Sequence, residues 1–460
     1  MTTTSSPDAS DTVVVVGAGI AGLVCAIELE AAGRRVVVLE READVGGRAR
    51  TRVVDGYVID RGFQVYFTAY PTLGGYLDIP ALVLRRFPPA ARIAGIADGR
   101  PASLIGDAIQ DPALLPGTLL ARGVSLADKL RLLALRRLAT SLTVDECFAP
   151  RYSGTSTRDF LRGRGLSAAV VARFFAPFYG GILLDRSLGA SASVLLFTFK
   201  MLAEGRAALP ARGIGAIAAQ LAARLRPGTV RTSAPVARVE ADGDGGVRGV
   251  VLESGERVDA AHVVLACEAP ASAALAATAG APRLAVPDGA LPCTTLYFAA
   301  AAAPPLVGAA LWLNAAAGVG EPDGPVVSHA VTLTEVAPEY ALPRQAAAGR
   351  HLLAASVVGE PALALDDAAL ERRARDDLAR MRGAPLPPDV ALVGVVRVPY
   401  AQFPQPPHFR EHRPSIAAGR RGLWLAGEAL HSSSLEGAAR GGRDAARALL
   451  SAAPAAASGR

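Results

Sequence analysis

The chain has 460 residues, a formal net charge of +6 at pH 7, and 51% hydrophobic against 20% charged residues. This composition supplies enough core for two packed domains and excludes disorder or a coiled coil as the main architecture. Its basic residues are scattered among acidic ones, so no nucleic-acid partner is expected. The four cysteines form no CxxC pair, which favours neither a zinc site nor a disulfide framework and fits a cytoplasmic location.

The N-terminal tail is polar and lacks the basic start of a signal peptide. Residues 289–320 carry no charge and could imitate a membrane-spanning helix. Their paired prolines, Pro304 and Pro305, would break such a helix. We therefore expect buried strands joined by a loop there, and no transmembrane segment.

Residues 12–40 predict a strand, a glycine-rich turn, a helix and a second strand. In the turn, Gly17 allows a tight bend, Gly19 lets the backbone approach a pyrophosphate, and Gly22 lets the helix pack against the sheet. Glu40 follows the second strand, where a carboxylate accepts ribose hydroxyls and repels a 2′-phosphate. The unit therefore predicts a site for FAD or NAD rather than NADP. Its predicted cofactor contacts are Gly17, Gly19, Ile20, Ala21, Gly22 and Glu40.

A helix is predicted over residues 126–142, with leucines on opposite faces. One face carries Leu126, Leu130 and Leu133, and the other carries Leu135, Leu138 and Leu142. A helix that is apolar all round is usually buried, and burial is the preferred interpretation. The alternative is peripheral contact with a membrane through a basic, apolar surface. The basic residues of that surface would be Lys129, Arg131, Arg136 and Arg137.

Two later segments have distinctive compositions. Residues 173–185 concentrate aromatic side chains, which either line an apolar substrate cavity or belong to the core. Residues 286–409 are predicted to form mostly strands, interrupted by one charged helix. The predicted strands lie at 293–299, 326–334, 350–358 and 390–398, and the helix at 363–381.

Two groups of polar residues lack the sequence pattern of a functional site. His408 and His412 have helical spacing but stand between prolines and lack a third ligand, so no metal is expected. His431 and the serines that follow it do not form the G-x-S-x-G turn of a hydrolase.

Three further motifs accompany the glycine-rich turn. Residues 41–50 read READVGGRAR, residues 56–65 read GYVIDRGFQV, and residues 422–450 begin GLWLAGEALHSSSLEGA. Together with residues 17–40, they resemble the FAD-binding superfamily of amine oxidases, protoporphyrinogen oxidases and phytoene desaturases. The resemblance is strongest to bacterial phytoene-desaturase-like oxidoreductases. A weaker match is the hairpin-like pair of strands over 233–252.

The resemblance implies FAD as the cofactor and a role for each motif. The Gly-Gly-Arg turn would lie against the diphosphate and ribityl chain, where Arg48 supplies a cation. Glu428 would hydrogen-bond the ribityl or diphosphate part, and Val236 would contact adenine through its backbone. The helix entered near Leu435 would point its positive end at the flavin. The further implied contacts are Arg41, Gly46, Gly47, Arg48, Gly62, Phe63, Val236, Gly427, Glu428, Leu435 and Glu436.

The same resemblance implies an α/β fold, with a Rossmann-like FAD-binding domain and an inserted α+β substrate domain of antiparallel sheet plus helices. We expect the FAD-binding domain to comprise residues 1–75, 205–285 and 410–460. The substrate domain would then comprise residues 76–204 and 286–409.

The chain departs from amine-oxidising relatives in two places. Many relatives have a lysine in the strand that corresponds to 294–298, but this chain has no lysine after Lys200. Many amine oxidases also have an aromatic-cage tyrosine just before the C-terminal Glu-Gly-Ala, and here Ser434-Leu435 stands there. A desaturase needs neither feature, only a channel that brings a C–H bond onto the flavin.

The predicted function is a FAD-dependent oxidoreductase that transfers a hydride from a large apolar substrate to flavin N5. The substrate would be a carotenoid, another isoprenoid or a porphyrinogen. The alternatives are amine oxidation with a different pocket and a flavin-bound isomerase without net redox turnover. The sequence assigns no catalytic residue and leaves the electron acceptor open among oxygen, quinone and NAD. It also leaves open a location at a membrane surface.

Overall fold

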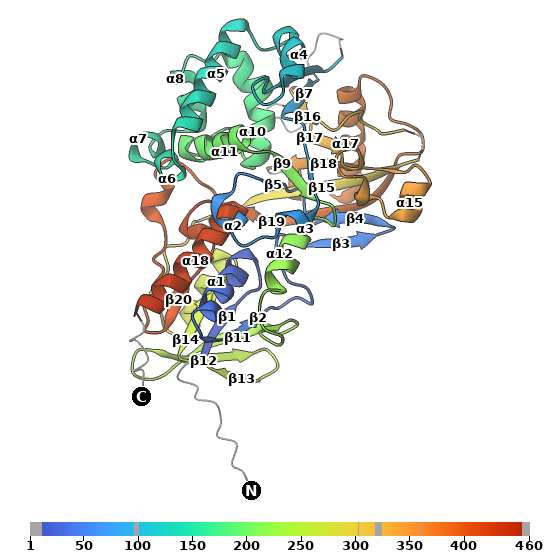
Figure 1. The fold of residues 1–460 in the computed structure, drawn as a ribbon. Coiled ribbons are helices and arrows are strands. Elements are labelled where there is room, and N and C mark those ends of the chain that lie inside the picture. Colours follow the sequence, from blue (N-terminus) through green and yellow to red (C-terminus); the bar gives the residue numbers. More distant parts are fainter. Residues whose placement is uncertain (1–11, 96–100, 302, 318–323, 360, 453–460) are drawn as a thin grey trace.

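The computed structural model describes residues 12–95, 101–301, 303–317, 324–359 and 361–452. A parallel five-stranded sheet in the order β10-β2-β1-β14-β20 lies at one end of the molecule (Figure 1). Its strands are β1 (Thr12–Val16), β2 (Arg35–Leu39), β10 (Val230–Arg231), β14 (His262–Leu265) and β20 (Leu423–Leu425). These strands come from three separate stretches of sequence, and the predicted α/β fold class is confirmed.

Two helices pack together against this sheet, α1 (Ile20–Ala31) and α18 (Leu435–Ala452) (Figure 1). The contact is close because glycines face backbone atoms. A Cβ at Gly22 would overlap the carbonyl oxygen of Gly17, and a Cβ at Gly442 would overlap that of Ala21. The helices can therefore approach each other and the turn only while these positions stay glycine.

A second, seven-stranded sheet has the order β19-β15-β18-β17-β16-β7-β8. All its pairs are antiparallel except β16 with β7, which run parallel. Within the predicted substrate domain, the sequence predicts strands only in residues 286–409, but β7 and β8 from residues 76–204 complete the sheet. Its strands are β7 (Ala90–Ala94), β8 (Ser103–Gly106), β15 (Leu291–Ala300), β16 (Leu311–Asn314), β17 (Val327–Thr332), β18 (His351–Val358) and β19 (Ala391–Gln402).

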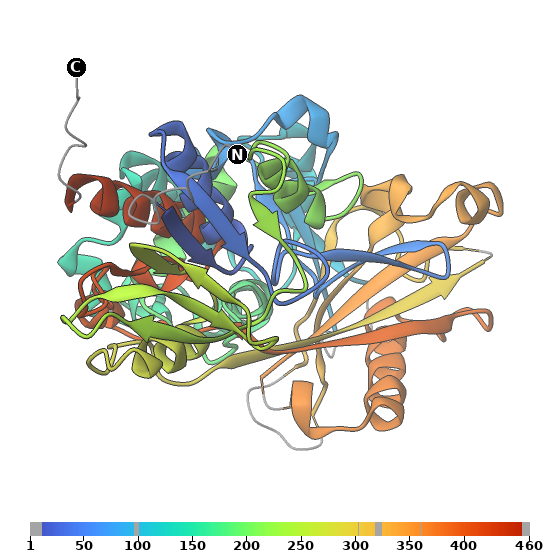
Figure 2. The same cartoon turned by 90° about the horizontal axis from the view of Figure 1, so that it is seen from below.

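The two faces of this sheet have different neighbours. One face packs on α17 (Asp367–Arg382) through an apolar cluster that includes Leu353 and Leu370 (Figure 2). The other face packs on the hairpin β3 (Thr51–Val54) and β4 (Tyr57–Asp60). Because the hairpin follows the Gly-Gly-Arg turn, this face of the sheet lies next to the predicted cofactor site.

Two smaller three-stranded sheets accompany these units. One contains β5 (Tyr66–Phe67), β6 (Leu84–Arg86) and β9 (Ala207–Pro210), and another contains β11 (Val236–Ala241), β12 (Val247–Leu252) and β13 (Arg257–Asp259). The domain boundaries drawn from the sequence stay a prediction.

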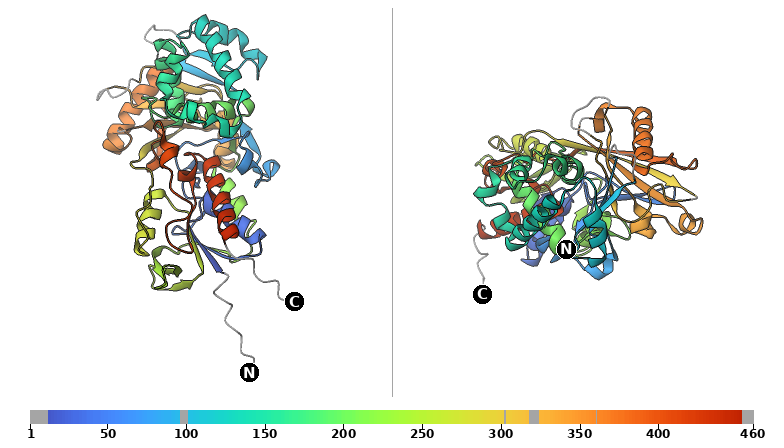
Figure 3. Two further views of the ribbon diagram at one scale, coloured as in Figure 1. Left: turned by 90° about the vertical axis from the view of Figure 1, so that its left-hand side faces the viewer. Right: turned by 90° about the horizontal axis from the view of Figure 1, so that it is seen from above.

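A cap of helices lies at the end opposite the parallel sheet (Figures 1 and 3). Its larger helices are α4 (Leu115–Leu120), α5 (Leu126–Ser141), α8 (Thr157–Gly163), α10 (Ala176–Ile182) and α11 (Ala192–Glu204). The burial predicted for the all-round apolar helix is wrong for one face of α5. Leu135 is buried, but Leu126, Leu130 and Leu133 are exposed. Only the face toward α11 is covered by the protein.

Candidate cofactor and active site

The glycine-rich turn between β1 and α1 has the geometry that its spacing predicts. Gly17 adopts φ +105°, which favours glycine, and its amide donates to Leu39 O at 2.8 Å. Gly19 caps α1 in an extended conformation, and a Cβ placed there would meet no atom within 4 Å. A Cβ at Gly47 would meet only the Gly19 Cα, at 3.7 Å. Two neighbouring glycines therefore border open space at a helix N-terminus, as a bound diphosphate requires.

Glu40 lies beneath this turn with only 8% of its surface exposed. Its Oε2 accepts a hydrogen bond from the Ala18 amide at 2.7 Å, and its Oε1 accepts one from the Glu42 amide at 3.0 Å. The carboxylate thus shapes the turn, a role that sequence analysis did not assign. Each oxygen keeps acceptor capacity for a ribose hydroxyl. The neighbouring Arg41 is exposed.

The start of β11 lies beside Glu40. The Glu40 carbonyl accepts a hydrogen bond from the Ala234 amide at 2.8 Å, and the Glu42 carbonyl accepts one from the Ser233 amide at 2.9 Å. These bonds bring Val236, the predicted adenine contact, to the same edge of the parallel sheet. Gly46 is also tied to the turn, because its amide donates to Ala18 O at 2.8 Å.

Arg48 and Glu428 join the two ends of the sequence in one ion pair. Arg48 Nη1 lies 2.6 Å from Glu428 Oε1 and donates to Ala401 O at 2.9 Å. Glu428 Oε2 accepts from the Ser433 hydroxyl at 2.9 Å. Burial lowers the pKa of Arg48, but the attraction of Glu428 outweighs it and holds the pKa above its ordinary value.

The space beside this ion pair has one buried polar atom without a partner among the described residues. That atom is the Tyr400 hydroxyl, whose ring centroid lies 5.8 Å from the Arg48 guanidinium. Gly427 has φ +137°, and a Cβ there would meet nothing within 4 Å. Open space beside a buried hydroxyl without a partner fits the polar part of FAD.

Gly62 and Phe63 lie against the seven-stranded sheet. The Phe63 amide donates to Thr295 Oγ1 at 3.1 Å, and the Phe63 ring centroid lies 5.5 Å from that of His329. A Cβ at Gly62 would lie 3.7 Å from Val398 and 4.0 Å from Thr295. The predicted residues are therefore brought to the sheet face that borders the cofactor site.

A row of three polar side chains, Thr295, Ser356 and His329, crosses that face of the seven-stranded sheet. Ser356 pairs in register with Thr295 on one side and with His329 on the other. Ser356 Oγ and His329 Nδ1 are both buried without a hydrogen-bond partner among the described residues. Burial, with a smaller effect from Arg186, lowers the pKa of His329 to about 4, so its imidazole is neutral at physiological pH. Sequence analysis missed this row, because a single strand does not show which residues stand beside it.

The N-terminus of α18 holds Leu435 and Glu436. Glu436 is 1% exposed, and its carboxylate accepts hydrogen bonds from the Thr72 and Leu73 amides at 3.0 to 3.1 Å. Its side chain thus caps the short helix α2 (Pro71–Gly74), which sequence analysis did not anticipate. A cofactor contact at this position would have to use the first-turn amides, which have no acceptor within the helix.

Asp60, quoted in the motif but given no role, joins three segments. Its Oδ1 accepts from Thr51 Oγ1 at 2.5 Å and from the Ile214 amide at 2.9 Å, and its Oδ2 accepts from the Tyr340 hydroxyl at 2.7 Å. Burial raises the pKa of Asp60 to about 6, against the lowering effect of these hydrogen bonds. The residue fixes the hairpin that carries Gly62 and Phe63.

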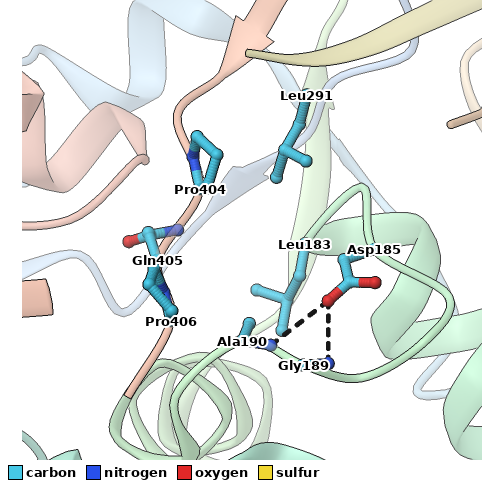
Figure 4. Close-up of a pocket in the computed structure, with 8 residues that line it drawn as sticks. All are labelled: Leu183, Asp185, Gly189, Ala190, Leu291, Pro404, Gln405 and Pro406. Carbon is cyan, nitrogen blue, oxygen red and sulfur yellow. Dashed lines mark hydrogen bonds between the residues drawn. The ribbon is translucent and has the colours of Figure 1, made fainter. Parts of the chain in front are cut away.

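A small cavity of about 220 Å³ opens near the Glu428 network (Figure 4). Most of its lining is apolar, and Asp185 is held there by the Gly189 and Ala190 amides at 2.7 and 3.2 Å. Gln405 connects the cavity to the ion pair, since its Oε1 accepts from the Ser433 amide at 2.9 Å. The cavity is lined by Leu183, Asp185, Gly189, Ala190, Leu291, Pro404, Gln405 and Pro406. The aromatic stretch at 173–185 contributes to both the cavity and the core, where Phe175 and Tyr179 are buried.

The comparisons with known proteins agree with this geometry. The sequence profile described as "Flavin containing amine oxidoreductase" matches residues 20–450. The chain belongs to the flavin-containing amine oxidoreductase family. Membership in this family implies that the chain uses a flavin cofactor and is an oxidoreductase.

Individual relatives match parts of the chain. The chain is 30% identical over 290 residues to a zeta-carotene-forming phytoene desaturase from Myxococcus xanthus. The aligned region covers 56% of this chain and 53% of that protein. The chain therefore spans about half of the length of that relative, and less of others, such as 18% of a phytoene dehydrogenase from Streptomyces griseus.

Solved structures share the fold of the family. A putative protoporphyrinogen oxidase from Exiguobacterium sp. 255-15 superimposes with a TM-score of 0.71 at 19% identity, covering 96% of this chain and 98% of that one. Putrescine oxidase bound to putrescine superimposes with a TM-score of 0.67 at 18% identity, covering 96% and 99%. At such identities the likeness establishes the fold alone.

Within the described residues, no helix is long and apolar enough to cross a membrane. The same residues contain no group of three or more His, Cys, Asp or Glu side chains that could hold a metal ion. His408 instead contacts the Glu411 carboxylate at 2.7 Å. All four cysteines are free.

Proposed function

We propose that this protein is a FAD-dependent oxidoreductase that takes a hydride from a large apolar substrate, such as a carotenoid, another isoprenoid or a porphyrinogen. The observation that carries the proposal is the sheet face beside Gly62 and Phe63. Thr295 and Val398 stand nearest to Gly62, and neither titrates. His329 is a titratable group beside Phe63, and its pKa of about 4 makes it a weak base at physiological pH. Such a face can orient a C–H bond but offers only a weak base for an amine.

The open space described above supports the proposed FAD contacts. Bound FAD would supply the electron-accepting ring, while the chain's own residues would hold its polar parts. Gly19 and Gly47 would border the diphosphate, Arg48 would neutralise it, and Glu40 would accept a ribose hydroxyl. The full set is Gly17, Gly19, Ile20, Ala21, Gly22, Glu40, Arg41, Gly46, Gly47, Arg48, Gly62, Phe63, Val236, Gly427, Glu428, and the amides of Leu435 and Glu436.

An amine oxidase is the competing proposal, because putrescine oxidase shares the fold. The lysines of this chain do not favour it. Only Lys129 and Lys200 occur in the sequence. Lys129 Nζ donates to Leu119 O at the end of α4, and Lys200 pairs with Glu204. Neither lies on β15, where amine-oxidising relatives carry one. An isomerase would use the same FAD site without net reduction.

The test is a set of anaerobic reductions of the FAD-loaded protein. The proposal expects loss of flavin absorption with an acyclic polyene or a porphyrinogen and no change with putrescine or benzylamine. Bleaching by an amine alone would replace the proposal with amine oxidation. Conversion of a polyene to an isomer without bleaching would favour the isomerase.

A substrate of this kind partitions into membranes, because burying its hydrocarbon surface removes it from water. We therefore also propose that the protein reaches its substrate through peripheral contact with a membrane. The electron acceptor, whether oxygen, quinone or NAD, would be distinguished by which of them reoxidises the bleached protein.

A further inference from the structure

The helical cap carries an unusual concentration of exposed apolar side chains. Among the described residues, eleven large hydrophobic side chains are exposed, and seven of them fall between residues 109 and 133. We call this set the leucine face. It consists of Ile109, Leu115, Leu119, Leu120, Leu126, Leu130 and Leu133, with exposed fractions from 48% to 80%. Clustered exposure of this kind marks an interaction surface.

The two helices of the leucine face are tied together. Lys129 Nζ, on α5, donates to Leu119 O at 2.7 Å and to Ala121 O at 3.3 Å, so it caps the C-terminal carbonyls of α4. At the other side of α5, Leu135 and Ala139 are packed in the core. These contacts fix the orientation of α5. As a result, the side chains of Leu126, Leu130 and Leu133 stay exposed to solvent.

The charge around the leucine face is positive. Residues 109–141, which carry the leucine face, contain five Lys and Arg against two Asp. Asp128, the one acid within α5, is 1% exposed. Burial favours its neutral form, but hydrogen bonds from Ser125 and Ser167 outweigh burial and lower its pKa. Arg131 and Arg137 on the same helix are exposed. A second copy of this chain would bring like charges together, whereas an anionic partner would be attracted.

A groove with two arginines borders the same face. It has a volume of about 390 Å³ and lies at the N-terminal end of α5. Arg122 and Arg173 line it, together with Ser125, Ser167 and the Asp128 carboxylate, which accepts hydrogen bonds from both serine hydroxyls. Arginine side chains bind phosphate groups well, so Arg122 and Arg173 can contact a lipid phosphate next to the apolar surface.

We propose that the α4–α5 leucine face docks on an anionic lipid bilayer. The leucines enter the boundary between headgroups and acyl chains, and the surrounding Lys and Arg contact the anionic headgroups. The parallel sheet lies at the opposite end of the molecule, so docking leaves the FAD site clear of the lipid (Figures 1 and 3). This inference names the surface and the lipid class for the proposed membrane contact, and it does not depend on the identity of the substrate.

The test is co-sedimentation of the full-length, FAD-loaded protein with lipid vesicles. We expect binding to vesicles of phosphatidylcholine with phosphatidylglycerol, and at least about tenfold weaker binding to phosphatidylcholine alone or at high salt. The variant Leu120→Ser with Leu126→Ser and Leu130→Ser should lose at least about tenfold in partitioning. The variant Arg122→Gln with Arg173→Gln should lose the preference for the anionic lipid.

A control variant changes three exposed hydrophobic residues elsewhere, as Val53→Ser with Val307→Ser and Leu363→Ser. It should bind vesicles like the wild type, and all variants should keep the wild-type Tm and FAD content. Absence of wild-type binding, or equal binding by the leucine variant, would overturn the proposal. So would a wild-type dimer that the leucine variant converts to a monomer, because the face would then join two copies. None of these results bears on the anaerobic reductions that test the proposed function.

Discussion

The guanidinium of Arg48 lies 2.6 Å from the carboxylate of Glu428, so an ion pair joins the N-terminal and C-terminal motifs beside the glycine turn. Both side chains are partly buried, with 24% and 12% of their surfaces exposed. Arg48 directly follows Gly47, the glycine that lies against Gly19. Because Arg48 also donates to Ala401 O, the segments around residues 48, 401 and 428 meet at this ion pair.

Replacing Arg48 tests its role toward the cofactor. Arg48→Gln should fold but bind FAD about 10- to 100-fold more weakly, because charge-assisted hydrogen bonds contribute about 1.5–3 kcal/mol. The measurement is a titration of flavin-free protein with FAD. Arg50→Gln is the control, since Arg50 pairs with the exposed Glu42 at 3.2 Å and such pairs contribute about 0–1 kcal/mol. Equal FAD affinity of the Arg48 variant and the wild type would refute the role.

Two glycines of the same turn should respond differently to alanine. Gly22→Ala places a Cβ on the Gly17 carbonyl oxygen and should destabilise the fold by about 1–3 kcal/mol. Gly19→Ala faces open space and should leave the Tm of the flavin-free protein unchanged while weakening FAD binding. Thermal unfolding and FAD titration separate the two effects. If Gly19→Ala bound FAD normally, the diphosphate would not lie against this glycine.

Asp60 should make stability depend on pH. Its pKa rises to about 6 in the folded protein, so the folded state holds the proton more tightly than the unfolded state. The contribution of Asp60 to stability is therefore greatest below pH 4 and falls by up to about 3 kcal/mol as the pH rises through 6. Asp60→Asn can keep the contacts to Thr51, Ile214 and Tyr340 and should remove this fall. Tm measured from pH 4 to 8 checks the prediction, and parallel curves for both proteins would contradict it.

His329 should make stability depend on pH in the opposite direction. Its pKa falls to about 4 on burial, so the unfolded state binds the proton more tightly. Its contribution is present above pH 6.5 and is lost, by about 3 kcal/mol, as the pH falls through 4. His329→Gln should therefore lose less stability than the wild type between pH 6.5 and 4. The same series of Tm measurements tests this, and an unchanged acid slope in the variant would count against it.

The local structure of the N-terminal unit could be predicted because its signals are local. The two strands predicted within residues 12–40 occur at 12–16 and 35–39, since each is a short valine-rich run that a glycine or a turn terminates. The strands predicted near 293–299, 326–334, 350–358 and 390–398 also occur, as do the helices near 126–142 and 363–381.

Long-range relationships could not be predicted from the same patterns. The pairing of β7 with β16 joins distant segments, and nothing local to either strand specifies it. The periodicity of α5 shows two apolar faces but not which one the protein covers. Glu436 was expected at the cofactor, yet its carboxylate caps α2, because the partner amides of Thr72 and Leu73 come from the other end of the chain.

The most direct test of the central claim is one anaerobic experiment. FAD-loaded protein is mixed with an acyclic isoprenoid polyene, and the flavin and polyene spectra are followed together. The account predicts that flavin absorption disappears while the polyene gains a conjugated double bond. An unchanged flavin spectrum with the polyene, together with bleaching by putrescine, would contradict the account.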